Sequence, residues 1–141
     1  KQGGKILIGG HKLEGGIFDN GFYVEPTIIT DVEKENIVAK EEIFGPVLVS
    51  FKVSDLSEAL DITNDAEFGL SSSIYTKDIK KAYKYINNAD TGMVHVNSPT
   101  LGGEVHLPFG GLKSSGVGHR EQGEEGFNFF TEIVSVYIDH S

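Results

Sequence analysis

The architecture of this chain follows from the run Val47-Leu48-Val49-Ser50-Phe51-Lys52-Val53. Apolar residues are nearly continuous here, which is typical of a strand covered on both faces. Two further runs with strand character follow at residues 71–76 and 92–97, and helical patterns separate the three. Alternating strands and helices with short connections indicate crossover units in a parallel sheet. We therefore predict an α/β fold: an open three-layer parallel sheet with flanking helices.

The two intervening helices have recognisable signals. Asp55-Leu56-Ser57-Glu58 resembles a capping box with aspartate as the cap, and the helix that it opens is expected to end near Phe68-Gly69. The second helix is predicted from an i, i+3, i+4, i+7 pattern. Its members are Ile79, Ala82, Tyr83 and Ile86.

Upstream of the apolar run, shorter elements are expected. Lys5–Ile8 is a short apolar run bounded by glycine and reads as a strand. Tyr23–Thr30 is rich in β-branched residues but contains Pro26, which cannot donate to a ladder, so we predict an edge or interrupted strand. Asp31 is predicted to cap a charged helical stretch that reaches Glu42.

The C-terminal segment differs in character from the rest. Phe127–Ile138 is strongly apolar, and Val134, Val136 and Ile138 fall on one side of a predicted strand. A strand this apolar invites association when it has no neighbour. We predict that it pairs outside the domain, and we divide the chain into residues 1–126 and a terminal strand, residues 127–141.

Composition limits the function classes. A chain of 141 residues with 38% hydrophobic content is expected to fold as one soluble unit. Its net charge of -9 argues against a nucleic-acid partner. No run is long and apolar enough for a membrane span, and the N-terminal residues lack a signal-peptide core, so a cytoplasmic location is predicted. The only methionine is Met93, which suggests a piece of a longer protein.

Glu42-Ile43-Phe44-Gly45-Pro46 is the candidate binding motif. In an extended segment Glu42 and Phe44 project to the same side. They could then present a hydroxyl acceptor and a flat ring to one ligand, such as a ribose with a ring attached. The alternative is a charged helix end that runs into a loop whose Phe44 caps the core.

Four segments, in this order, resemble the aldehyde dehydrogenase superfamily. They are Lys40–Val47, Asn97–Thr100, Pro108–Gly116 and Thr131-Glu132. The resemblance implies that Glu42 holds the nicotinamide ribose of NAD or NADP and that Phe44 lies near the nicotinamide ring. It also implies that the terminal strand, Phe127 to Ile138, belongs to an oligomerisation sheet and so mediates a homo-oligomer.

The long glycine-rich loop from Asn97 to Gly118 is expected to form a wall of the site, because Asn97 stands at the carboxyl end of a predicted strand. The resemblance implies that Phe109 lies near the aldehyde, although a core aromatic under a glycine loop is an equal alternative. Asn97 is expected to order the loop. Glu104 is similar to a residue of semialdehyde and other polar-aldehyde dehydrogenases. Arg120 is given no role, because His119 interrupts the family pattern.

Other chemistries are disfavoured. Gly110-Gly111-Leu112-Lys113-Ser114 is not a phosphate-binding loop, since Leu112 stands where glycine must precede the lysine. No Gly-x-Gly-x-x-Gly fingerprint and no Gly-x-Ser-x-Gly elbow occurs. The five histidines show no ligand spacing, so no metal site is predicted.

Two functional hypotheses remain. Members of the resembled family oxidise an aldehyde to a carboxylic acid through a cysteine thiohemiacetal, with NAD(P) as cofactor. This chain has no cysteine, so it would be the C-terminal part of the catalytic domain, would contain no catalytic residue and would be inactive alone. The alternative is a free-standing, catalytically dead dimerisation module.

Overall fold

The strand predicted at residues 47–53 is present but shorter than predicted. In the computed structural model, which describes residues 3–141, it forms β5 (Val47–Val49) and pairs in parallel with β4 (Thr27–Thr30). The strand β1 (Lys5–Ile8) lies antiparallel to β4, so the sheet order is β1-β4-β5. Leu48 is 60% exposed. We had predicted that this strand is covered on both faces, and within this chain it is not.

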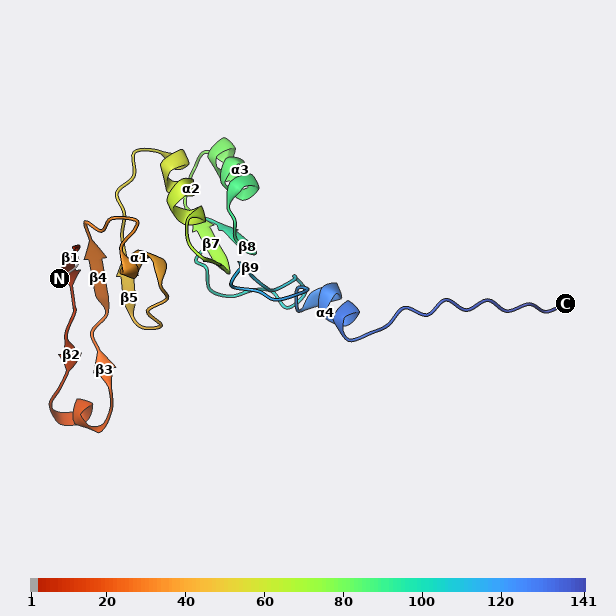
Figure 1. Ribbon diagram of the computed structural model, residues 1–141, viewed down its shortest axis with the longest axis horizontal. Coiled ribbons are helices and arrows are strands. Elements are labelled where there is room, and N and C mark those ends of the chain that lie inside the picture. Colours follow the sequence, from red (N-terminus) through yellow and green to blue (C-terminus); the bar gives the residue numbers. More distant parts are fainter. Residues whose placement is uncertain (1–2) are drawn as a thin grey trace. The chain divides into compact units, whose positions relative to one another are not determined.

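The chain divides into two compact units, residues 1–66 and residues 67–141, so the prediction of one folded unit is wrong. Figure 1 shows the elements of both. In the second unit, β7 (Ser71–Ile74) and β8 (Met93–Val96) pair in parallel, and α3 (Ile79–Asn88) connects them. The predicted strand, helix and strand are thus present, and the α/β class is confirmed. The parallel pairs lie in separate sheets, because β5 pairs with β4 whereas β7 pairs with β8.

The helix α3 forms where its pattern predicted, with a different buried face. Asp78 caps it by accepting hydrogen bonds from the backbone N–H groups of Lys80 and Lys81, at 2.9 and 3.4 Å. Ala82 and Tyr85 are buried, whereas Tyr83 is exposed. The buried face of α3 therefore contains Ala82 and Tyr85. It does not contain Tyr83, which we had predicted to lie on it.

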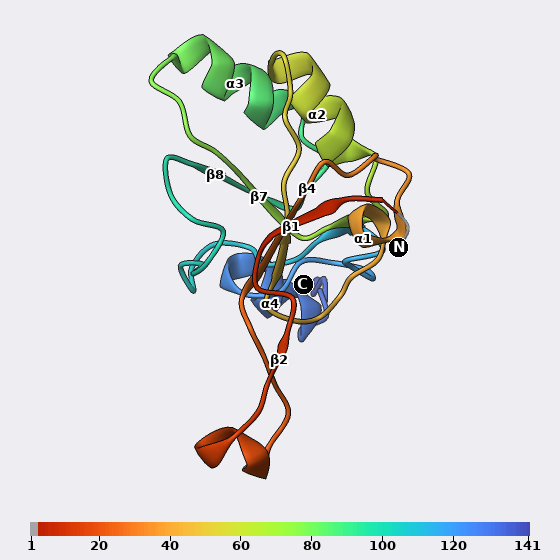
Figure 2. The ribbon, with the colours of Figure 1, turned by 90° about the vertical axis from the view of Figure 1, so that its left-hand side faces the viewer.

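The interrupted strand is confirmed. β3 (Tyr23–Val24) and β4 are separate, and Pro26 lies between them. β3 pairs antiparallel with β2 (Lys12–Leu13), and a short 3-10 helix, η1 (Gly16–Asn20), closes this hairpin at its tip (Figure 2). The proline thus separates the hairpin from the three-stranded sheet.

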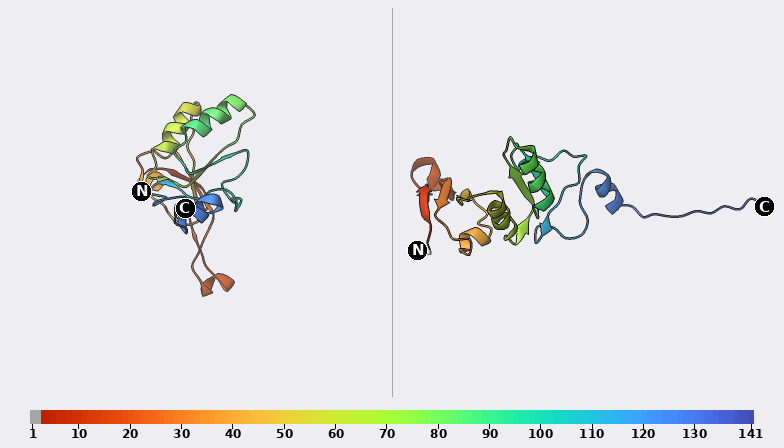
Figure 3. Two further views of the ribbon diagram at one scale, coloured as in Figure 1. Left: turned by 90° about the vertical axis from the view of Figure 1, so that its right-hand side faces the viewer. Right: turned by 90° about the horizontal axis from the view of Figure 1, so that it is seen from above.

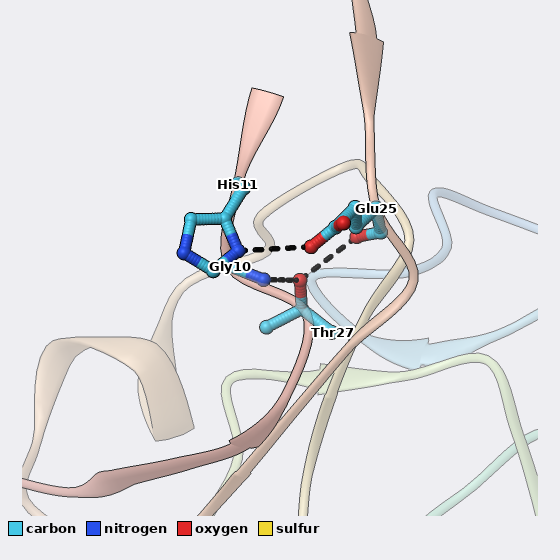
Figure 4. Close-up of polar contacts among 4 residues, drawn as sticks. All are labelled: Gly10, His11, Glu25 and Thr27. Carbon is cyan, nitrogen blue, oxygen red and sulfur yellow. Dashed lines mark hydrogen bonds and ion pairs between the residues drawn. The ribbon is translucent and has the colours of Figure 1, made fainter. Parts of the chain in front are cut away.

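A small polar network holds the base of the hairpin (Figure 4). Thr27 Oγ1 accepts from the N–H of Gly10 at 2.9 Å and donates to the carbonyl oxygen of Glu25 at 2.8 Å. His11 Nδ1 lies 3.0 Å from Glu25 Oε2. These contacts join the two arms of the hairpin where each enters the sheet.

The prediction of a helix from Asp31 to Glu42 is wrong in its extent. Only α1 (Ile37–Lys40) is helical, and Asn36 caps it by accepting from the N–H of Val38 at 3.1 Å. Asp31 cannot be the cap, because its φ of 54° turns the chain out of the path of a right-handed helix.

The capping box at the start of α2 (Leu56–Asn64) is confirmed. Asp55 accepts from the N–H groups of Ser57 and Glu58, at 2.8 and 3.0 Å. Glu58 accepts in turn from the N–H and the hydroxyl of Ser54, both at 2.7 Å. These hydrogen bonds, from the backbone first and then from the side chain of Ser54, lower the pKa of Glu58 below its ordinary value. The helix ends at Asn64, earlier than predicted.

The last predicted strand is not present as a strand. Residues from Phe127 to Phe129 end α4 (Gly123–Phe129), and residues 131–141 follow as an extended segment with no strand assigned (Figures 1 and 3). The side chains of Ile133 and Tyr137 are almost fully exposed. A strand needs a partner for its backbone groups, and the described residues provide none here. The division after residue 126 falls within α4 and stays a prediction.

The interior of the described chain is small. Its buried apolar side chains are Val32, Leu60, Ala82 and Tyr85. Large apolar side chains that remain exposed occur in both units, which is unusual for a protein that functions alone. Among the described residues, none of the helices has the length and apolar character to cross a membrane.

Candidate functional site

The loop that carries Glu42 and Phe44 connects α1 to β5. Its end is held by Thr27, whose N–H donates to the carbonyl oxygen of Pro46 at 2.8 Å. A tight turn precedes β5, since the N–H of Val47 donates to the carbonyl oxygen of Gly45 at 2.7 Å. The Gly-Pro segment therefore fixes the loop against the central strand β4.

Phe44 is presented to solvent and not buried. Its side chain is 92% exposed and its φ is 53°. A bulky residue in the left-handed region carries strain, and such residues concentrate at functional sites. The alternative in which Phe44 caps the core of this chain is therefore wrong.

Glu42 and Phe44 line one shallow hollow of about 270 Å³. Its other lining residues are Val38, Glu41, Ile43, Gly45, Val47 and Val49. The hollow thus brings an acceptor-only carboxylate and an aromatic ring to one surface, together with the valines of α1 and β5. This is the pairing expected for a ribose and a flat heterocycle. A larger hollow of the first unit, of about 650 Å³, is lined by neither residue.

Asn97 acts on the backbone at the end of the parallel pair. Its Oδ1 accepts from the N–H of Thr76 at 2.8 Å, and its Nδ2 donates to the carbonyl oxygen of Thr76 at 3.0 Å. The φ of Asn97 is 57°, a conformation that asparagine tolerates better than most residues. Its amide therefore joins the ends of β7 and β8, and Asn97 is not among the residues that line the neighbouring cavity.

Glu104 and Phe109 line one cavity of about 250 Å³ in the second unit. Phe109 is held by two backbone hydrogen bonds to Glu121, at 2.7 and 2.8 Å. The remaining lining residues are Gly92, Met93, Val94, His95, Gly103, Leu107, Pro108 and Gln122. The loop and the strand β8 thus enclose a mainly apolar space with a carboxylate, an imidazole and an amide in its wall.

The glycine loop beside this cavity is organised by a residue to which we had given no role. Arg120 Nη1 donates to the carbonyl oxygen of Gly111, and a Cβ on Gly110 would lie 3.0 Å from Arg120 Cδ. Ser115 Oγ accepts from the N–H of Gly69 at 3.0 Å. The excess of glycine around a single arginine was the available signal, since glycine allows such close approach.

The polar groups of the two hollows suit hydrogen bonding to an organic ligand. Among residues 3–141 no group of three or more His, Asp or Glu side chains is placed to hold a metal ion. The polar groups that line the two hollows are carboxylates, an imidazole and an amide. They can accept or exchange hydrogen bonds with hydroxyl, amide and carbonyl groups of a bound molecule.

Known proteins resemble this chain along nearly its whole length. A family model described as "Aldehyde dehydrogenase family" matches residues 1–136. Alpha-ketoglutaric semialdehyde dehydrogenase of Bacillus subtilis is 46% identical over 98% of this chain and 28% of its own length. Betaine aldehyde dehydrogenase of Brucella anthropi is 39% identical, again over 98% of this chain and 28% of its own length.

Solved structures agree. The crystal structure of Mycobacterium tuberculosis aldehyde dehydrogenase complexed with NAD+ has a TM-score of 0.84 and 38% identity, covering 92% of this chain and 26% of that one. This chain belongs to the aldehyde dehydrogenase family. It spans little more than a quarter of the length of these relatives.

Proposed function

We propose that this chain forms part of an NAD(P)-dependent aldehyde dehydrogenase, which oxidises an aldehyde to a carboxylic acid. The observation that carries the proposal is the exposed pair Glu42 and Phe44 on one hollow, in a chain that belongs to this family. The M. tuberculosis relative binds NAD+, and a Saccharomyces cerevisiae relative, 39% identical, is an aldehyde dehydrogenase of the NAD(P)+ type. Bound NAD(P) would supply the hydride acceptor.

The residues of the first unit fit the nicotinamide end of this cofactor. The Glu42 carboxylate can accept hydrogen bonds from both ribose hydroxyls, since each of its oxygens has free lone pairs. The Phe44 ring offers a flat apolar face to the nicotinamide. Neither group does chemistry; they orient the ring for hydride transfer.

The residues of the second unit fit a substrate wall. Phe109 and Leu107 offer apolar surface to the carbon chain of an aldehyde, and Glu104 offers an acceptor at the same cavity. Asn97 supports this wall indirectly, by ordering the ends of β7 and β8. The relatives named above act on a semialdehyde and on betaine aldehyde, so a small polar aldehyde is the substrate class that we propose.

A chimera tests the proposal. We expect that the B. subtilis enzyme, with its matching segment replaced by this chain, oxidises an aldehyde with NAD or NADP. The chain alone is expected to be inactive, because the family's nucleophile is a cysteine and this chain has none. The measurement is nucleotide reduction at 340 nm. A chimera that folds and binds no nucleotide would contradict the cofactor assignment. Activity of the chain alone would contradict the proposal that the nucleophile lies outside it.

Association through the C-terminal segment is the second part of the proposal. The predicted oligomerisation strand, Phe127 to Ile138, begins within α4, so we expect its remaining part, residues 133–138, to pair with a strand of a second copy. Val134, Val136 and Ile138 are all exposed. Val134→Asp combined with Val136→Asp should lower the solution mass to that of a monomer. Ser135→Asp, which lies on the other side of the same strand, should not. Light scattering distinguishes these results, and a wild-type protein that stays monomeric at high concentration contradicts this part.

A further inference from the structure

The loop that presents Glu42 and Phe44 is also held at its start, by an ion pair. Lys40 Nζ contacts the Asp65 carboxylate and also lies 3.3 Å from the backbone carbonyl oxygen of Asp65, to which it donates. Lys40 is the last residue of α1, and Asp65 is the C-cap of α2. The pair therefore joins two helix ends that are 25 residues apart in the sequence.

The two anchors leave only residues 41–45 between them. Pro46 is fixed by its hydrogen bond from Thr27, and Lys40 is fixed by Asp65. The intervening segment contains Phe44 in its left-handed conformation. A strained backbone conformation persists only when its surroundings determine it, and the two anchors supply that constraint.

We propose that Lys40 and Asp65 are positioning residues for the nicotinamide-ribose site. Their ion pair sets the direction in which the chain leaves α1, and so the place at which Glu42 and Phe44 are presented. Neither residue lines the hollow that would receive the ligand. The identity of that ligand rests on the proposed function, whereas the ordering of the loop does not.

The exposure of the pair determines which effect its loss should have. The side chains of Lys40 and Asp65 are 35% and 46% exposed. Ion pairs this open to solvent contribute little to global stability. Removing the pair should therefore loosen residues 41–45 without unfolding the protein.

The test uses the full polypeptide as its gene encodes it, with the variants Lys40→Met, Asp65→Asn and the charge-exchanged double variant Lys40→Asp/Asp65→Lys. Lys12→Met is the matched control, because Lys12 forms an exposed ion pair with Glu14 on the hairpin, at 3.2 Å. We expect amide hydrogen exchange at Glu41, whose N–H donates to the carbonyl oxygen of Ile37 at 2.9 Å, to become about 5-fold faster in the single variants. The KM for the nucleotide should rise by about 5-fold while the KM for the aldehyde stays constant.

The control should match wild type in both measurements, and the double variant should recover part of both effects. A lowered melting temperature with unchanged exchange at Glu41 would mean that the pair only stabilises the two helices, and would overturn the proposal. Faster exchange with an unchanged nucleotide KM would overturn its functional part. A wild-type protein that oxidises no aldehyde would refute the proposed function instead, and the exchange data would still decide whether the pair orders the loop.

Discussion

Replacing Gly92 by alanine is expected to destabilise the second unit strongly. A Cβ at this position would lie 1.9 Å from the carbonyl oxygen of Gly110, 2.8 Å from its carbonyl carbon and 2.9 Å from the Cα of Gly111. All three atoms belong to the backbone, so no side-chain rotation can relieve the overlap. Overpacking of this kind costs about 3 kcal/mol or more.

Because of its position, a substitution at Gly92 should also disturb β8 and the neighbouring cavity. Its N–H donates to the carbonyl oxygen of Gly69 at 2.9 Å, and Met93, the next residue, begins β8. If the glycine loop moves away from β8, Phe109 moves with it, because Phe109 directly precedes Gly110. The substitution is therefore expected to abolish the cavity shared by Glu104 and Phe109 as well.

Gly103→Ala is the matched control for Gly92→Ala. Gly103 lines the same cavity, but a Cβ there meets no heavy atom within 4 Å, and its φ is not in the left-handed region. We expect its melting temperature to equal that of wild type, whereas Gly92→Ala should lower it by about 10 °C. Calorimetry of the full polypeptide measures both. A Gly92→Ala protein as stable as wild type would show that the loop packs elsewhere.

The elements that sequence predicted best are those specified by neighbouring residues. Asp55 caps α2 through its own local backbone, so the start of this helix was predicted from the sequence. Asp78 caps α3 in the same local way, although that helix was predicted from its apolar pattern alone. Pro26 interrupts a strand for an equally local reason. These features do not depend on what packs against them.

The wrong predictions concern features that depend on contacts between residues far apart in the sequence. The run from Val47 looked like a buried strand, but its burial depends on neighbours that the described residues do not include. Strand formation after Phe130 likewise needs a partner. Asp31 carried the right residue type for a cap, and its φ could not be known from composition.

The roles of the candidate site residues stay predictions. Glu42 and Phe44 were chosen as a pair from one motif, Phe109 and Glu104 were chosen separately from the resemblance, and the members of each pair line a common hollow. His95 and Gln122 were missed as lining residues, because the fold brings β8 and the start of α4 to the same cavity. Nothing in the local sequence of either residue indicates such a meeting.

Glu42→Gln is expected to reduce kcat/KM for the nucleotide by about 10- to 100-fold in the full polypeptide, since hydrogen bonds to a charged group contribute about 1.5–3 kcal/mol. Glutamine keeps the size of the side chain but replaces one acceptor oxygen by a donor amide. That amide nitrogen cannot accept from a ribose hydroxyl, and the hydrogen bond to the remaining oxygen is no longer made to a charged group. Glu14→Gln, an exposed carboxylate on the hairpin, is the control and should leave the kinetics unchanged.

Two substitutions of Phe44 separate the contribution of its ring to nucleotide binding from that of the loop conformation. Phe44→Gly removes the ring but accepts the φ of 53° without strain, whereas Phe44→Ala removes the ring and keeps the strain. If the ring contacts the nicotinamide, both variants should lose about 10-fold in nucleotide affinity. If only the loop conformation matters, Phe44→Ala should bind as wild type does, whereas Phe44→Gly should lose affinity because glycine also populates other conformations. Nucleotide titration of the two variants decides between these outcomes, and wild-type affinity in both would remove Phe44 from the site.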